Sequence, residues 1–188
     1  GQYALREGWL IWEEGSRIRL KEDTGGEAEA FEQRFRDSVR TGLNAQDARK
    51  VLSIRGEYFA RKAGQENAVW LFMDRIDKAD DNGEAFFEYV CRRKPEKVDC
   101  YFVIDRASAD HERLGRMGHV VDALSEEHCV LLPMAEYVFT SQLNGWAENP
   151  YGGLEEYFRD LYHRPKVVFL QHGVTKDDQT GWLNRYNQ

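Results

Sequence analysis

Cysteine is scarce in this chain, and its spacing fits no cysteine-based site. The three cysteines, Cys91, Cys100 and Cys129, include no C-x-x-C pair. An odd, widely spaced set suits neither a disulfide framework nor a zinc site. We expect reduced, buried cysteines, and we expect neither a bound metal nor a cofactor.

The chain also lacks long apolar runs and a surplus of positive charge. It has no run of about 18 apolar residues and no short apolar segment behind a basic start, so neither a membrane span nor a secretory signal is predicted. The formal net charge is -7, with both signs mixed along the sequence. That distribution does not suit the neutralisation of a nucleic-acid backbone. We expect a soluble, cytoplasmic protein with no nucleic-acid partner.

Three well-known enzyme signatures are absent as well. There is no G-x-G-x-x-G, no P-loop lysine motif and no G-x-S-x-G elbow, so dinucleotide binding, P-loop phosphoryl transfer and serine hydrolysis lose support. A length of 188 residues predicts one main domain. The chain begins at Gly1 without a methionine and stops at Gln188 after a loop-like stretch. These ends are typical of a fragment of a longer protein.

From Ala68 onward, the sequence alternates short apolar runs with helical segments. This pattern is typical of strand-helix-strand units around a parallel sheet. The runs are almost continuously apolar, as expected for strands buried on both faces. We predict a Rossmann-like, three-layer α/β domain with a mostly parallel sheet. Its predicted strands are Ala68–Met73, Val98–Ile104, His119–Asp122, Tyr137–Thr140 and Val167–Gln171.

Residues 1–22 have a different pattern. Tyr3–Trp12 and Ser16–Leu20 are aromatic and β-branched runs separated by the turn-like Glu13–Gly15, which predicts a β-hairpin. The hairpin could belong to a preceding region of a longer protein. We therefore assign residues 1–22 to the hairpin and residues 23–188 to the α/β unit.

Capping residues and apolar spacing predict the helices. Asn44, Asp81 and Ser125 can accept hydrogen bonds from the N–H groups of a first helical turn. A further helix is predicted from apolar residues at i, i+3, i+4 and i+7, with Pro165 ending it. The apolar positions behind these predictions are Phe31, Phe35 and Val39; Val51, Leu52, Tyr58 and Phe59; Phe86, Tyr89 and Val90; and Leu154, Tyr157, Phe158 and Leu161.

His172 is the strongest candidate for chemistry. Ligands of open parallel sheets bind beyond the carboxyl ends of the strands, and His172 follows the predicted strand Val167–Gln171 and precedes Gly173. Its ordinary pKa of about 6.5 suits a general base at neutral pH if a neighbour orients the ring. The alternative, a histidine that only hydrogen-bonds a loop carbonyl, stays open.

Other polar residues follow the same strand ends. Arg75 and Lys176 could balance phosphate charge, and plain surface charge is the alternative for both. The backbone N–H groups of Gly173 and Val174 could stabilise an oxyanion if a helix begins there. These residues extend the candidate site around His172.

Two further groups have competing interpretations. Thr140 and Ser141 either hold a phosphate or hydroxyl, or only end a strand. Asp77, Asp80 and Asp81 offer hard oxygen ligands to a divalent cation, but their spacing matches no calcium loop, and capping of the next helix is favoured. The remaining histidines share no spacing, and we assign structural roles to them: His111, His119, His128 and His163.

Four blocks of the sequence carry a family resemblance when they are taken together. The blocks are Trp70–Arg75, Ala79–Phe86, Thr140–Ser141 and Phe169–Asp177. In this order they resemble the CDP-glycerol glycerophosphotransferase family, whose members build teichoic acids and related polyol-phosphate polymers. The resemblance spans about residues 66 to 184, and its most specific parts are Asp80–Glu84 and Gln171–Gly173.

The resemblance implies one half of a GT-B-type fold. This half faces the acceptor, and a C-terminal half that is absent from this chain binds the donor, CDP-glycerol or a related CDP-polyol. His172 is then the base that deprotonates the hydroxyl end of a polyol-phosphate polymer or lipid-linked primer. The protein is expected at the inner face of the cell membrane, as a peripheral protein. The implied substrate-binding residues are Gln171, Gly173, Thr175, Lys176, Asp74, Arg75 and Ser141.

The sequence departs from the family in two ways. Members that make wall teichoic acid tend to have tryptophan before the His-Gly pair, where this chain has Gln171, which indicates a branch with another acceptor or another polyol. The residues that hold the donor's phosphates belong to the absent half, so the chain alone is expected to be inactive. Two other functions stay open, a non-catalytic polymer-binding module and half of a sugar transferase on the same scaffold.

Overall fold

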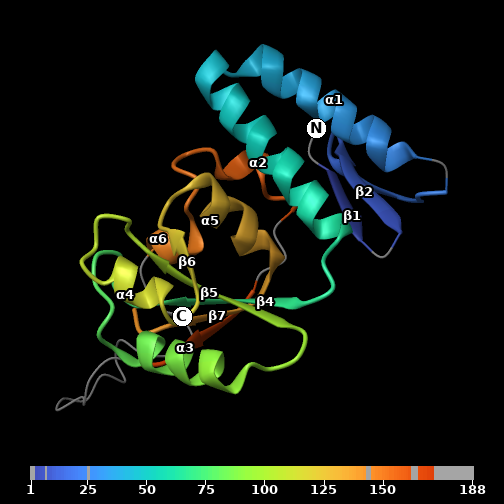
Figure 1. The fold of residues 1–188 in the computed structure, drawn as a ribbon. Coiled ribbons are helices and arrows are strands. Elements are labelled where there is room, and N and C mark those ends of the chain that lie inside the picture. Colours follow the sequence, from blue (N-terminus) through green and yellow to red (C-terminus); the bar gives the residue numbers. More distant parts are fainter. Residues whose placement is uncertain (1–2, 7, 25, 143–144, 162–164, 172–188) are drawn as a thin grey trace, which may run out of the picture.

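The computed structural model describes residues 3–6, 8–24, 26–142, 145–161 and 165–171. They form a five-stranded parallel sheet flanked by helices and a small three-stranded antiparallel sheet at the amino-terminal end (Figure 1). The α/β class, the parallel sheet and the amino-terminal hairpin predicted from the sequence are confirmed. Among the described residues, no helix is long and apolar enough to cross a membrane.

The parallel sheet contains the five predicted strands, three of them with the predicted bounds. They are β4 (Ala68–Met73), β5 (Val98–Ile104), β6 (His119–Asp122), β7 (Ala135–Thr140) and β8 (Lys166–Phe169). Their order across the sheet is β6-β5-β4-β7-β8. From β4 the chain adds β5 and then β6 on one side, crosses back, and adds β7 and then β8 on the other side. The shared carboxyl end of β4 and β7 is therefore the switch point of the sheet.

The predicted caps at Asn44 and Ser125 are confirmed. Asn44 Oδ1 accepts from the backbone N–H groups of Gln46 and Asp47 at 3.1 and 3.0 Å, and Ser125 Oγ accepts from that of His128 at 3.2 Å.

The helices are α1 (Glu27–Gly42), α2 (Ala45–Ala63), α3 (Asn82–Arg93), α4 (His111–Gly115), α5 (Glu126–Leu131) and α6 (Gly145–Glu148), with the short 3-10 turns η1 (Leu132–Met134) and η2 (Glu155–Tyr157).

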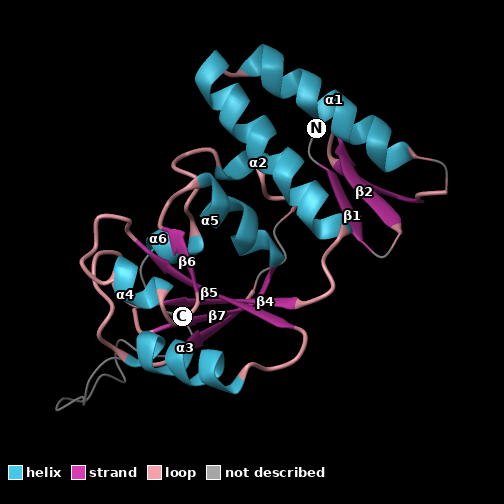
Figure 2. Cartoon of the chain, in the orientation of Figure 1, coloured by secondary structure: helices cyan, strands magenta, loops and turns pink. Residues whose placement is uncertain are grey.

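Side chains of the central strands alternate between two cores, which explains why these strands are apolar throughout. In β4, Leu71 and Met73 face the core formed with α1, α2 and α5, whereas Phe72 faces the core formed with α3 and α4. Figure 2 shows α2 and α5 on one side of the sheet and α3 on the other. The second core is aromatic, and the Phe72 ring lies 5.4 Å from that of Phe87 and 5.0 Å from that of Phe139.

The amino-terminal sheet has one more strand than predicted. The predicted strand Tyr3–Trp12 is two strands, β1 (Tyr3–Arg6) and β2 (Trp9–Glu14), and β3 (Arg17–Glu22) completes the sheet. Gly8, between β1 and β2, has a φ of 83°. Glycine adopts this left-handed conformation without steric cost, so Gly8 suits the turn between β1 and β2.

The prediction of a helix over residues 154–161 is wrong. The structure has only the turn η2 there, although Leu154, Phe158 and Leu161 are buried. In an α-helix, the carbonyl of Tyr157 would accept from the N–H of Leu161. Instead, Leu161 N–H donates to Phe158 O at 3.0 Å, and Tyr157 O accepts from Arg55 Nη1 at 2.8 Å. A contact from α2 therefore replaces the helical hydrogen bond.

Arg55 is a fully buried cation that joins α1, α2 and the segment after α6. Its guanidinium lies 2.6 Å from a carboxylate oxygen of Glu32 and 2.7 Å from one of Asp160. Its Cζ lies 4.0 Å from the centre of the Phe35 ring. Burial lowers the pKa of Arg55, but the bonds to Asp160 and Glu32 outweigh it and raise the pKa above its ordinary value. The cation is therefore paired, as a buried charge must be.

His128 is fully buried in α5. Its Nδ1 accepts a hydrogen bond from the backbone N–H of Leu124 at 3.3 Å. Leu124 has a φ of 63°, a value that residues other than glycine adopt infrequently. Burial lowers the pKa of His128 to about 4, which favours the neutral ring that accepts this bond.

Candidate active site

The candidate site lies at the switch point, where three strands end close together. β4 and β7 are neighbours with Met73 paired to Thr140, and β8 lies beyond β7. Ser141 N–H donates to Met73 O at 3.2 Å, and Leu170 N–H donates to Thr140 O at 2.8 Å. Ligands of open α/β sheets bind at this edge, so the residues that follow each strand define the candidate site.

Asp74, the first residue after β4, is the buried centre of this edge. Its Oδ1 accepts from Ser141 Oγ at 2.6 Å and from Gly83 N–H at 2.9 Å. Its Oδ2 accepts from the N–H groups of Glu84 at 3.0 Å and Asp81 at 3.3 Å. Burial raises the pKa of Asp74, and these four hydrogen bonds oppose that shift. The carboxylate thereby ties the end of β4 to the end of β7 and to the start of α3.

Gly83 is required for this close approach. A Cβ atom at Gly83 would lie 2.4 Å from Asp74 Oδ1 and 2.6 Å from Met73 O. Both distances are far below van der Waals contact, and the carbonyl belongs to the backbone of β4, which cannot move aside cheaply. The glycine therefore lets the first turn of α3 rest directly on the end of β4.

The bonds to Asp74 also change the usual chemistry of a helix start. The free N–H groups and the dipole of a helix make its N-terminus a common phosphate site. Here the N–H groups of Gly83 and Glu84 already bind the Asp74 carboxylate. A phosphate placed there would meet a negative charge already in position, so this helix start does not suit a nucleotide donor.

Asn82, the first residue of α3, joins this edge to the end of β8. Its side-chain Nδ2 donates to the carbonyl oxygens of Gln171 at 2.6 Å and Leu170 at 3.2 Å. Gln171 has a φ of 53°, which is left-handed. The side chain therefore binds two consecutive carbonyls where the chain leaves β8, directly before His172 in the sequence.

Sequence reasoning did not identify Asn82 as a site residue. At the start of a helix, an asparagine next to Asp81 indicates only a local cap, whereas its partners are 88 and 89 residues away. Asp81 Oδ1 does accept from Asn82 N–H at 2.8 Å, so the predicted cap is confirmed. One signal was present, because the two most specific blocks of the family resemblance each contain one partner of the Asn82–Gln171 contact.

The loop from β4 to α3 has contacts with α4 and ion pairs of its own. Arg113 of α4 donates to Ala79 O at 3.3 Å, and Ala79 N–H donates to Asp110 Oδ2 at 3.1 Å. Arg75 and Lys78 both pair with Asp80, which lowers the pKa of that exposed carboxyl. Within the described part of the chain, no cluster of side chains is suited to hold a metal ion.

The structure brings together four of the predicted substrate-binding residues. Asp74 and Ser141 are buried, whereas Arg75 and Gln171 are exposed. The hydroxyl of Thr140 donates to the carbonyl of Gln142 at 2.6 Å, as expected of a residue that ends a strand. Other candidates lie outside the described residues, namely His172, Gly173, Val174, Thr175, Lys176 and the structural candidate His163.

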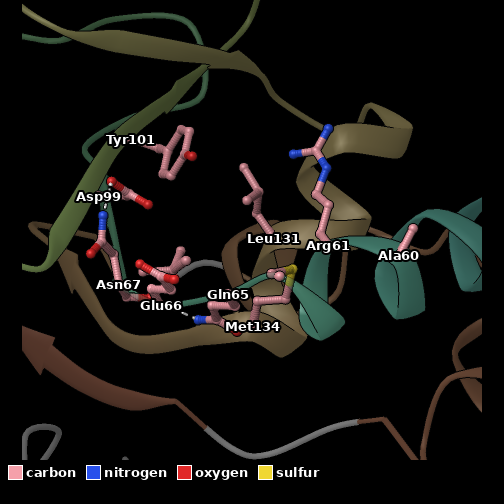
Figure 3. A pocket seen from close by; sticks show the side chains of 11 residues that line it. Ala60, Arg61, Gln65, Glu66, Asn67, Asp99, Tyr101, Leu131 and Met134 are labelled. Atoms are coloured by element: carbon pink, nitrogen blue, oxygen red, sulfur yellow. Dashed lines mark hydrogen bonds between the residues drawn. The ribbon is translucent and has the colours of Figure 1, made fainter.

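A cavity of about 460 Å³ lies at the opposite, amino-terminal edge of the sheet. Figure 3 shows Asp99, Tyr101 and Glu66 on one side of it and Arg61 on the other. Arg61 is the only positively charged residue among its eleven lining residues, and it already pairs with Glu57 at 2.7 Å and with Glu127 at 3.5 Å. The cavity thus offers no unpaired cation to a phosphate, and it lies away from the edge where α/β sheets bind ligands.

Comparison with known proteins gives one informative match. No family model matches the chain, and no solved structure matches it. Over 153 residues, it is 37% identical to the minor teichoic acid biosynthesis protein GgaB of Bacillus subtilis (strain 168). The chain is related to a teichoic acid biosynthesis protein. The match covers 81% of this chain but 16% of GgaB, so the relation concerns one segment of that protein.

The relation to GgaB bears on the family resemblance seen in the sequence. The resemblance implied a relation to teichoic acid biosynthesis proteins, and the match to GgaB confirms that relation. The reaction, the donor and the roles of individual residues stay predictions.

Proposed function

We propose that this chain is the acceptor-side half of an enzyme similar to the CDP-glycerol glycerophosphotransferases. The enzyme would transfer polyol phosphate from a CDP-activated donor to the hydroxyl end of a teichoic-acid-type or capsular polymer. The observation that carries the proposal is the 37% identity to GgaB over 153 residues. A donor-binding half and a polymer or lipid-linked primer complete the proposed system.

In the proposed reaction, His172 takes the proton from the terminal hydroxyl of the acceptor. The alkoxide oxygen then attacks the β-phosphorus of the CDP-polyol, the bond from that phosphorus to the bridging oxygen breaks, and CMP leaves. Catalysis of phosphoryl transfer depends mainly on positioning and on stabilising the developing charge. Gln171, Gly173, Thr175 and Lys176 are proposed to bind substrate beside His172.

The chemistry at the switch point supports the acceptor side. The start of α3 is occupied by the Asp74 carboxylate, so its first N–H groups are not available to the phosphates of a nucleotide donor. Asp74 and Ser141 are buried and bonded to each other at 2.6 Å. We assign them to the support of this edge, and we assign the contacts with the acceptor to the exposed residues Arg75 and Gln171 and to the residues that follow.

The proposal is tested by measuring polymer extension with the full-length protein, in which this chain and the proposed donor-binding half are joined. The donors are radiolabelled CDP-glycerol, other CDP-polyols and UDP-sugars. His172→Ala is expected to lower kcat/KM at least about 100-fold, because a positioned general base contributes roughly 10²–10⁴-fold. His119→Ala is the matched control, since His119 is an exposed histidine at the start of β6, away from this edge. Full activity of His172→Ala would refute the assigned base and favour a non-catalytic polymer-binding module.

Two further outcomes limit the proposal. Transfer from UDP-sugars alone would assign the chain to a sugar transferase on the same scaffold. The 188-residue chain by itself is expected to form no polymer from CDP-glycerol, because the donor's phosphates are proposed to bind elsewhere. Polymer formation by the isolated chain would overturn the division into acceptor and donor halves.

A further inference from the structure

We propose that Asn82 is a positioning residue that sets the backbone leading into His172. The consequence for catalysis rests on the proposed function, whereas the positioning itself does not. Asn82 Nδ2 lies 2.6 Å from Gln171 O and 3.2 Å from Leu170 O. Gln171 is the residue directly before His172, so this amide acts on the last described peptide before the proposed base.

The two bonds require an amide at position 82. An asparagine side chain has two N–H donors on one nitrogen, which can serve two carbonyl oxygens at once. A carboxylate in its place would repel both carbonyls, and an alanine would leave them to water. The left-handed φ of 53° at Gln171 is one that residues other than glycine adopt infrequently and with strain. The Asn82 bonds contribute to holding the chain in this conformation.

Asn82 is itself held in place from the buried side. The two residues that follow it, Gly83 and Glu84, donate their N–H groups to Asp74, which is 1% exposed. Asp74 in turn accepts from the buried Ser141. The hydrogen bonds therefore run from the ends of β4 and β7 through the first turn of α3 to the exit of β8. A positioning group needs such a rigid support to be effective.

A role in sheet stability does not explain the same contacts. β8 is already paired with β7 over Lys166–Phe169, and Leu170 N–H is bonded to Thr140 O at 2.8 Å. The Asn82 bonds act on carbonyls that lie beyond this pairing. Their removal should change the path of the chain after β8 more than the stability of the sheet.

Histidine-selective NMR of the protein tests the positioning. The chain has five histidines, and His172→Gln assigns the signal of His172. Asn82→Ala is expected to change the chemical shift and pKa of His172 while leaving the signals of His119 and His128 in place. Asn67→Ala is the matched control, because Asn67 donates to Asp99 Oδ1 at 3.0 Å at the opposite edge of the sheet. Asn82→Asp, which keeps the size of the side chain, should change the His172 signal further.

Kinetics of the complete enzyme test the consequence. Asn82→Ala is expected to lower kcat about 10- to 100-fold with little change in donor KM, because small misplacements of a reacting group are costly. An unchanged His172 signal in both Asn82 variants overturns the positioning, and an unchanged kcat in an active enzyme overturns its consequence for catalysis. If the wild-type enzyme transfers nothing from any CDP-polyol, the proposed function fails, while a shifted His172 signal still supports the positioning.

Discussion

Replacement of Asp74 by alanine should be among the most damaging single substitutions at the switch point. The carboxylate is 1% exposed and accepts four hydrogen bonds. Its removal leaves the Ser141 hydroxyl and the first N–H groups of α3 without their acceptor. Each buried donor left unpaired costs about 1–3 kcal/mol, and water can reach part of the exposed helix start. We expect a loss of about 4 kcal/mol in the free energy of unfolding.

Thermal and urea unfolding measure this loss. For a domain of this size, about 4 kcal/mol corresponds to a decrease in Tm of roughly 10 °C. Asp80→Ala is the matched control in the same loop, since the Asp80 carboxylate is exposed and pairs only with the surface cations Arg75 and Lys78 in the described structure. Its Tm should stay close to that of the wild type. Equal Tm values for the two variants would refute the view that Asp74 joins β4, β7 and α3.

Three further substitutions test the packing elsewhere. Gly83→Ala should destabilise the protein strongly because its Cβ would lie 2.4 Å from Asp74 Oδ1. Gly56→Ala, in open space within α2, should stabilise it by about 0.5–1 kcal/mol. The urea midpoint should therefore fall for the first variant and rise for the second, and shifts in the same direction would contradict the steric argument. Arg55→Met should cost about 3–5 kcal/mol because it leaves two carboxylates without their buried partner, while Arg36→Met, which breaks a partly exposed pair with one of the same carboxylates, should cost less than about 1 kcal/mol. Burial lowers the pKa of His128 to about 4, below its value in the unfolded chain, so its contribution to the free energy of unfolding is complete above about pH 6.5 and decreases as the pH falls towards 4. His128→Leu should remove this part of the pH dependence of unfolding. An unchanged pH profile of that variant would contradict the argument.

The parallel sheet could be predicted well from the sequence because its signal is local. Each of the central strands is buried on both faces, so burial itself produces a continuous apolar run, and β4, β5 and β6 have the predicted bounds. The end of β8 was less predictable. Leu170 continues the apolar pattern, but the residues of β8 paired with β7 end at Phe169, and Gln171 has a left-handed φ.

The elements that were mispredicted depend on contacts between distant parts of the chain. Residues 154–161 have the apolar spacing of a helix, yet Arg55, about 100 residues earlier, takes the carbonyl of Tyr157 that a helix would use. The contacts at the site also join distant parts of the chain. The carboxylate of Asp74, whose role in substrate binding stays a prediction, bonds to Ser141 and to the start of α3, and Asn82 bonds to carbonyls 88 and 89 residues away. Pattern reasoning along the sequence has no access to such pairs.

The carboxylate at the start of α3 has a consequence for the choice of chemical probes. Inhibitors of phosphoryl-transfer enzymes are commonly built around phosphate mimics, which seek helix starts with unpaired N–H groups. At the start of α3 those groups already bind Asp74, so an anionic fragment would be repelled from this helix start. Screening directed at the start of α3 should therefore begin with uncharged, hydroxyl-rich compounds.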